Sequence, residues 1–175
     1  MATLSKGKFA IDFGIITLEA ELGDEDRQCA WELYVEMSTR VAVTGKIGDP
    51  LCRDFSGELY IESLESLYRF FQAARGIMRA FPVGRIRGDN RNHLGIIIHR
   101  LLNDVLRPFL ETWQGKYRHW WEFESNLHVS PFRRQEQFSE LKDFLEDWSD
   151  LRWLMREAQA ELVKSYQLVD VTDGS

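Results

Sequence analysis

Apolar residues recur every three or four positions along most of the chain, which is the spacing of one face of an α-helix. Segments 23–43, 62–81, 92–121 and 132–167 follow this pattern, and the stretches between them are rich in residues that break helices. Short connections between amphipathic helices favour neighbours that run in opposite directions. The pattern therefore predicts a mainly α fold, built as an antiparallel four-helix bundle.

One stretch follows the alternating pattern of a β-strand instead. In KFAIDFGIITLEAEL, residues 8–22, the side chains of Phe9, Ile11 and Phe13 share one face, and the apolar phase changes near Gly14. Glycine permits the backbone angles of a bulge or a tight turn, and either would change the phase. We expect a short N-terminal bulged strand or hairpin at 8–22, packed against the bundle.

Each predicted helix has one face that carries its large apolar residues. The stripe of the first helix is Trp31, Tyr34, Val35, Ser38, Val41 and Ala42. The stripe of the third helix is Leu94, Ile98, Leu101, Leu102, Val105, Leu106, Phe109 and Trp113. Pro108 lies inside the third helix and should kink it, because proline lacks the N–H that a helix interior needs. Cys29 falls outside the stripe of the first helix, and the acidic Asp147 falls outside the apolar face of the fourth helix. Both are therefore expected at the surface.

Length and charge narrow the classes of function. A chain of 175 residues fits one domain, 1–175, with the polar end 170–175 as a mobile tail. The net charge of −6 disfavours binding to nucleic acid or to an anionic membrane. Only Cys29 and Cys52 occur, no apolar run is long enough to span a bilayer, and the start lacks a signal peptide. These features predict a cytoplasmic protein.

Motifs for catalysis and metal binding do not occur in the sequence. The chain has no HExxH, CxxC or Glu-x-x-His spacing, so we expect no metal site. It also has no GxSxG, no Walker loop and no dinucleotide fingerprint. We therefore predict no catalytic residue, no cofactor and no enzymatic activity, while an enzyme without a recognisable motif remains the third-ranked alternative.

The stretch GRIRGDNRNHLGIII, residues 84–98, places three arginines before an apolar helix. Arginine binds phosphate through a planar fork, and the unpaired N–H groups at a helix start favour anions. Arg85, Arg87, Arg91 and Asn92 are therefore a candidate anion site. A solvated loop with an ordinary asparagine cap explains the same residues, and we favour that interpretation.

The stretch WQGKYRHWWEFE places Trp113, Tyr117 and Trp120 near one helical face, and Trp121 flanks it. Tryptophan and tyrosine are common anchors of protein interfaces, so these residues are a candidate partner surface. Packing in the core is the alternative, and we consider it the more common reason for such a cluster.

Two stretches, AWELYVEMSTRVAV (Ala30–Val43) and LNDVLRPFLETW (Leu102–Trp113), resemble segments of small, uncharacterised helical proteins of bacteria. Genes for such proteins sometimes lie beside defence or conflict genes, and the resemblance implies an accessory or signalling role, including antiviral defence. It transfers no catalytic residue. Our leading hypothesis is a non-enzymatic bundle that binds another protein or forms an oligomer, and the alternative is a sensor of an anionic small molecule or nucleotide.

Overall fold

The structure is a computed structural model that describes residues 2–13, 23–80 and 94–172. These residues are mainly helical, with one small antiparallel sheet. The sheet pairs β1 (Ala2–Lys6) with β2 (Phe9–Phe13). The α-helices are α1 (Asp24–Ser38), α2 (Val41–Thr44), α3 (Tyr60–Ala80), α4 (Leu94–Arg100), α5 (Arg107–His119), α6 (Pro131–Gln135) and α7 (Leu141–Tyr166). The π-helical segments are η2 (Leu101–Leu106) and η3 (Trp120–Glu124).

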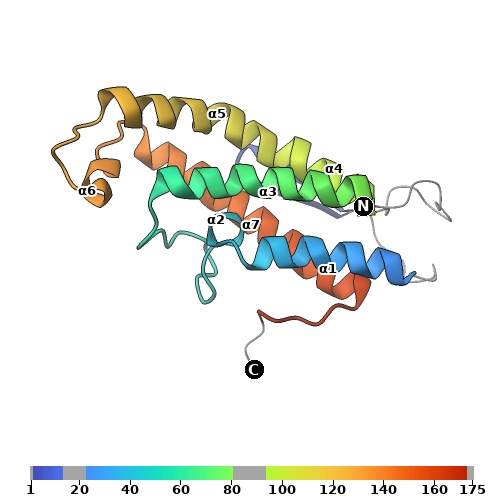
Figure 1. The fold of residues 1–175 in the computed structure, drawn as a ribbon. Coiled ribbons are helices and arrows are strands. Elements are labelled where there is room, and N and C mark those ends of the chain that lie inside the picture. The colour runs from blue at the N-terminus through green and yellow to red at the C-terminus, as the bar shows by residue number, and fades with distance from the viewer. Residues whose placement is uncertain (1, 14–22, 81–93, 173–175) are drawn as a thin grey trace.

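The long helices lie side by side and alternate in direction (Figure 1). Figure 1 shows α1, α3, the continuous α4–η2–α5 segment and α7 each running opposite to the one before it in the chain. Helix α7 contacts α1, α2, α5 and both strands, so it is the element around which the others pack. The predicted mainly helical fold with an N-terminal β element is confirmed.

The β element begins earlier than the sequence pattern indicates. Strand β2 lies within the predicted range 8–22, but its partner β1 precedes that range. The turn is formed by Gly7 and Lys8, and Gly7 has a positive φ of 54°, as the first position of a tight hairpin turn requires. The phase change expected at Gly14 lies outside the described residues.

The predicted stripe of the third helix is confirmed, because all eight of its residues are buried. Pro108 is accommodated by a change of hydrogen-bond register rather than by a break in the helix. In the turns before it, the chain follows the wider π-helical pattern of η2, and Pro108 then falls in the first turn of α5, where its missing N–H is not needed.

The predicted stripe of the first helix is wrong for most of its members. The residues of α1 that are buried are Cys29, Ala30, Leu33, Tyr34 and Met37. Helix α1 ends at Ser38, and a second short helix starts at Val41, so a periodicity drawn through both segments has the wrong phase. The fourth predicted helix is likewise interrupted, between Gln135 of α6 and Leu141 of α7.

Asp170 and Val171, at the start of the predicted tail, contact α1. The hydroxyl of Tyr34 donates to Asp170 Oδ1 at 3.0 Å and accepts from the amide of Val171 at 2.8 Å. Residues 173–175 lie outside the described part of the chain. Tyr34 is fully buried beneath this contact, so the segment after α7 covers part of the α1 surface.

Candidate functional site

The two candidate sites from the sequence have different outcomes. Arg85, Arg87, Arg91 and Asn92 of the anion site fall in residues 81–93, outside the described part of the chain. The four aromatic residues of the partner surface are all described, and they divide into two buried and two partly exposed side chains.

Trp113 and Tyr117 are buried in the core, which is the core-packing interpretation of these two residues. Trp113 is 2% exposed, and its indole N–H donates to Asp147 Oδ2 at 2.9 Å. Tyr117 is fully buried and stacks on Phe144 with ring centroids 5.2 Å apart. Burial raises the pKa of the Tyr117 hydroxyl. The face of α5 that carries these two rings points toward α7, which explains their burial.

Trp120 and Trp121 lie one turn after Tyr117, at the start of η3, and both are half-buried. Trp120 packs on Phe138 with ring centroids 5.1 Å apart. The guanidinium of Arg134 lies 3.4 Å from the ring centroid of Trp121, in the stacked arrangement that arginine and tryptophan favour. The two rings therefore attach α6 and the connection that follows it to the end of α5.

Three large apolar side chains beside this tryptophan pair face solvent. Phe123 is 74% exposed, Leu127 is 70% exposed and Phe132 is 52% exposed. They belong to η3, to the connection after it and to α6, which together form one end of the molecule in Figure 1. We call this set the distal surface; its members are Trp120, Trp121, Phe123, Leu127 and Phe132.

Helix α6 behind the distal surface is fixed by a buried amide. The side chain of Gln135 accepts a hydrogen bond from the amide of Tyr60 at 2.9 Å and donates one to the carbonyl of Glu58 at 2.9 Å. Ser130 and Pro131 start α6 as an N-cap and first-turn proline, which the sequence contains in that order. Helix α6, which carries Phe132 of the distal surface, is thus held in position by the core, so a partner would not have to order this helix.

A second surface region is the connection between α2 and α3. Residues 45–57, here called the clamped loop, are fixed by arginine side chains from α7. Arg156 donates four hydrogen bonds, of 2.6–3.1 Å, to the carbonyls of Thr44, Lys46 and Asp49. These bonds satisfy loop carbonyls that would otherwise need water, because the loop has no regular structure of its own.

Arg152 anchors the two ends of the clamped loop from inside the core. It is fully buried, and its Nη2 donates to Glu58 Oε2 at 2.6 Å. Its Nε bonds the carbonyl of Ala42, which the indole of Trp148 also bonds at 2.9 Å. Burial lowers the pKa of Arg152, and the carboxylate of Glu58 opposes that effect. The pair is therefore a structural anchor for the segments that enter and leave the loop.

The clamped loop exposes two aliphatic side chains while its cysteine faces inward. Ile47 is 81% exposed and Leu51 is 59% exposed, whereas Cys52 is fully buried. Burial also raises the pKa of the Cys52 thiol, so this group is a poor nucleophile. Cys29, expected at the surface, is likewise buried with a raised thiol pKa.

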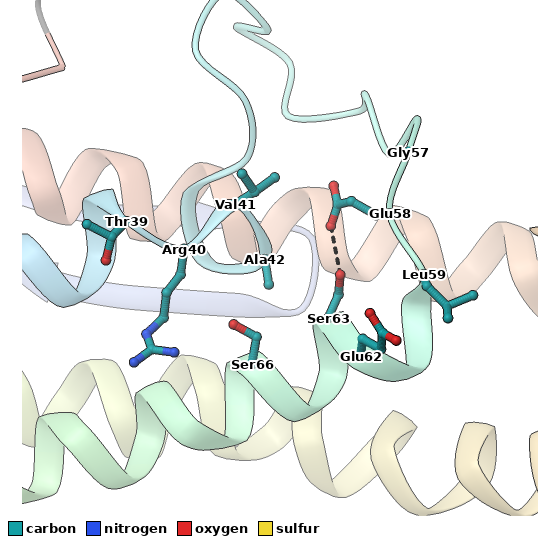
Figure 2. A pocket seen from close by; sticks show the side chains of 10 residues that line it. All are labelled: Thr39, Arg40, Val41, Ala42, Gly57, Glu58, Leu59, Glu62, Ser63 and Ser66. Carbon is teal, nitrogen blue, oxygen red and sulfur yellow. Dashed lines mark hydrogen bonds between the residues drawn. The ribbon is translucent and has the colours of Figure 1, made fainter.

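A shallow groove of about 320 Å³ lies between α2 and the start of α3 (Figure 2). Its chemistry is polar: Arg40, Glu58, Glu62, Ser63 and Ser66 line it together with apolar residues of α2. Ser63 donates to Glu58 Oε2 at 3.0 Å, and the same oxygen accepts from Arg152. That carboxylate is ion-paired and cannot serve as a free base for Ser63, so the pair does not form a nucleophilic site.

Within residues 2–13, 23–80 and 94–172, no three His, Cys, Asp or Glu side chains come together in a way that could bind a metal ion. No helix in the same described residues is both long enough and apolar enough to cross a membrane.

Asp147 was predicted to lie at the surface, but it is buried. It accepts hydrogen bonds from Trp113 and from Lys8 Nζ, the latter at 2.9 Å, and so ties the hairpin turn to α5 and α7.

Comparison of the chain with protein-family models, with curated proteins and with solved structures finds no significant match. The geometry of the chain itself is therefore the basis for a proposal about function.

Proposed function

We propose that this chain is a non-enzymatic helical-bundle protein that acts by binding another protein through the distal surface. The observation that carries the proposal is the grouping of Phe123, Leu127 and Phe132, all more than half exposed, within ten residues of sequence. Scattered single apolar residues are normal on a monomer, but a group of large ones marks an interaction site.

The composition and setting of the distal surface support the same proposal. Tryptophan, phenylalanine and arginine are enriched at the centres of interfaces, and the same end of the molecule carries Trp120 and Trp121, which contact each other, and Arg134, which stacks on Trp121. Trp120 and Trp121 are half-buried, so a partner that covers this end of the molecule beyond Phe123 can also remove the exposed parts of the two indoles from water. That extra burial adds to the apolar area gained on binding.

The cellular setting is the less direct part of the proposal. We propose a cytoplasmic accessory component of a bacterial defence or signalling system, and this rests on the resemblance of Ala30–Val43 and Leu102–Trp113 to small bacterial helical proteins. The presence of a defence phenotype in cells that carry the gene, and its loss on deletion, would test that part separately from the distal surface.

The binding proposal is tested with the double variant Phe123→Asp/Phe132→Asp. A photo-crosslinking amino acid at position 127 in the cell should form adducts of defined mass with the wild-type surface and lose them in the double variant. Ile47→Asp is the matched control, because it makes the same kind of change at an exposed apolar residue of the clamped loop. Adducts that persist unchanged in the double variant would show that the distal surface is not the contact.

A further inference from the structure

We infer that the partner of the distal surface is a second copy of this chain. This inference rests on the proposed function, since it names the occupant of the same surface. It goes further in one respect: two copies would meet through identical residues around a two-fold axis. Such a contact requires a surface that is complementary to itself in both charge and apolar area.

The charge of the segment that carries the distal surface meets this requirement. Residues 120–135 contain two arginines, Arg133 and Arg134, and two glutamates, Glu122 and Glu124, so the segment has a formal charge of zero. The whole chain has −6, and therefore the remaining residues carry all of the net charge. An approach of two copies through a neutral segment avoids most of the repulsion between two acidic chains. The clamped loop is neutral as well, with Lys46 and Arg53 against Asp49 and Asp54, but it exposes two large apolar side chains where the distal segment exposes three.

The arrangement of charge around the apolar residues also suits a two-fold contact. Arg133, Glu122 and Glu124 are exposed and flank Phe123 and Phe132 in sequence. Arg134 is already stacked on Trp121, so it stabilises the surface itself. Because the segment exposes both signs of charge, Glu122 or Glu124 of one copy can pair with Arg133 of the other in a two-fold contact. An unrelated acidic or basic partner would instead be matched by an excess of one sign, which this segment lacks.

The position of the surface is compatible with two copies. Figure 1 shows η3, the following connection and α6 at one end of the long helices, so a second copy would be added end to end. The helix faces that form the core are already covered within one chain, because the buried residues of α3, α5 and α7 pack against each other. Self-association would therefore bury new surface without opening the fold.

The test is sedimentation velocity of the full chain over a wide range of concentration. We expect wild type to pass from monomer to dimer, with a midpoint that Phe123→Asp/Phe132→Asp raises at least tenfold. Ile47→Asp should keep the wild-type midpoint, which controls for a new carboxylate on an exposed apolar position. Circular dichroism of each variant checks that helix content is unchanged, and Leu127→Ser is a milder second variant if the double variant is poorly folded.

Added salt provides an independent readout. The pairs between Glu122 or Glu124 and Arg133 are exposed and contribute little, while each whole chain carries −6, so screening by salt should strengthen the dimer. A dimer that weakens with salt would show that ion pairs, and not the apolar side chains, carry the contact. Wild type that stays monomeric at all concentrations would overturn the second-copy inference. If crosslinks at position 127 then identify a different protein, the proposed function survives. A wild-type dimer with the same midpoint in all distal variants would also overturn the second-copy inference, whereas the proposed function is overturned only if the crosslinks at position 127 persist in the double variant.

Discussion

The clamped loop and the distal surface both expose large apolar side chains, but different interactions hold the two regions in place. Residues 45–57 have no regular structure, and hydrogen bonds from Arg152 and Arg156 of α7 fix the loop and its two ends. The distal surface is carried by short helical elements and is fixed by packing of Trp120 on Phe138 and Arg134 on Trp121. The clamped loop depends on directional bonds from arginine, whereas the distal surface depends on aromatic contact area together with the two hydrogen bonds of Gln135.

This difference determines which region tolerates change. A directional bond from a buried arginine has few substitutes, and removal of one partner leaves the other charge uncompensated in the core. Aromatic contacts are numerous and less directional, so the loss of one exposed ring leaves the others in place. We therefore expect the clamped loop to be the fragile region, and the distal surface to be the region where sequence can change with little effect on folding.

The largest expected effect is at Arg152. Arg152→Ala removes the ion pair with Glu58 and the bond to Ala42, and leaves the mostly buried carboxylate of Glu58 without its cation. Breaking a buried pair in this way costs about 3–5 kcal/mol of unfolding free energy. Denaturant titration measures it, and the double variant Arg152→Ala/Glu58→Gln should recover part of the loss. A loss below about 1 kcal/mol would mean that solvent reaches the pair.

A smaller effect is expected at Arg156. Arg156→Ala removes four hydrogen bonds to the carbonyls of Thr44, Lys46 and Asp49, but Arg156 is only part-buried, so water can replace some of them. We expect a loss of about 2–3 kcal/mol, since bonds that involve a charge contribute roughly 1.5–3 kcal/mol and do not add fully. Hydrogen exchange should show the amides of the loop losing protection before those of α7. Uniform loss across the chain would contradict a local role.

The sequence was informative where one periodic pattern covers one element. The stripe of the third helix was predicted correctly through Pro108, because a shift of register in η2 keeps its apolar residues on the inner face. The pattern failed across Thr39 and Arg40, where a helix ends and another begins within two residues. No local signal of glycine or proline marks that break. Strand β1 was missed because a short polar strand shows no clear alternation.

The residues that fix the clamped loop could have been suspected from spacing alone. Arg152 follows Trp148 by four positions and precedes Met155 by three, so it lies within the apolar stripe of α7, where a charge needs a partner. The partner, Glu58, is 94 residues away in sequence, and helical periodicity carries no information about such a pair. Asp147 could not be placed for the same reason, because its donors come from the hairpin turn and α5.

A third effect concerns one carboxylate of the clamped loop. The Ser56 hydroxyl and amide, together with Lys46, lower the pKa of Asp54 to about 2. Because the folded pKa lies below the ordinary value of 3.8, the contribution of Asp54 is present above that value and is lost as the pH falls toward about 2. An NMR titration should give this low pKa, and Ser56→Ala should return it toward 3.8. An unchanged pKa in Ser56→Ala would contradict the proposed hydrogen bonds.

The smallest expected effect on folding is at the distal surface, and it is the sharpest contrast with Arg152. Phe123 is 74% exposed, so Phe123→Asp removes little buried area and should change the unfolding free energy of the monomer by no more than about 0.5 kcal/mol. The measurement must be made below the concentration at which the chain associates, because a dimer adds stability that depends on protein concentration. At higher concentration wild type should gain stability and the variant should not. Equal stability of the two proteins at every concentration would remove the evidence that Phe123 contributes to association, while a large loss in the monomer would show that Phe123 belongs to the core and that the two regions do not differ as argued.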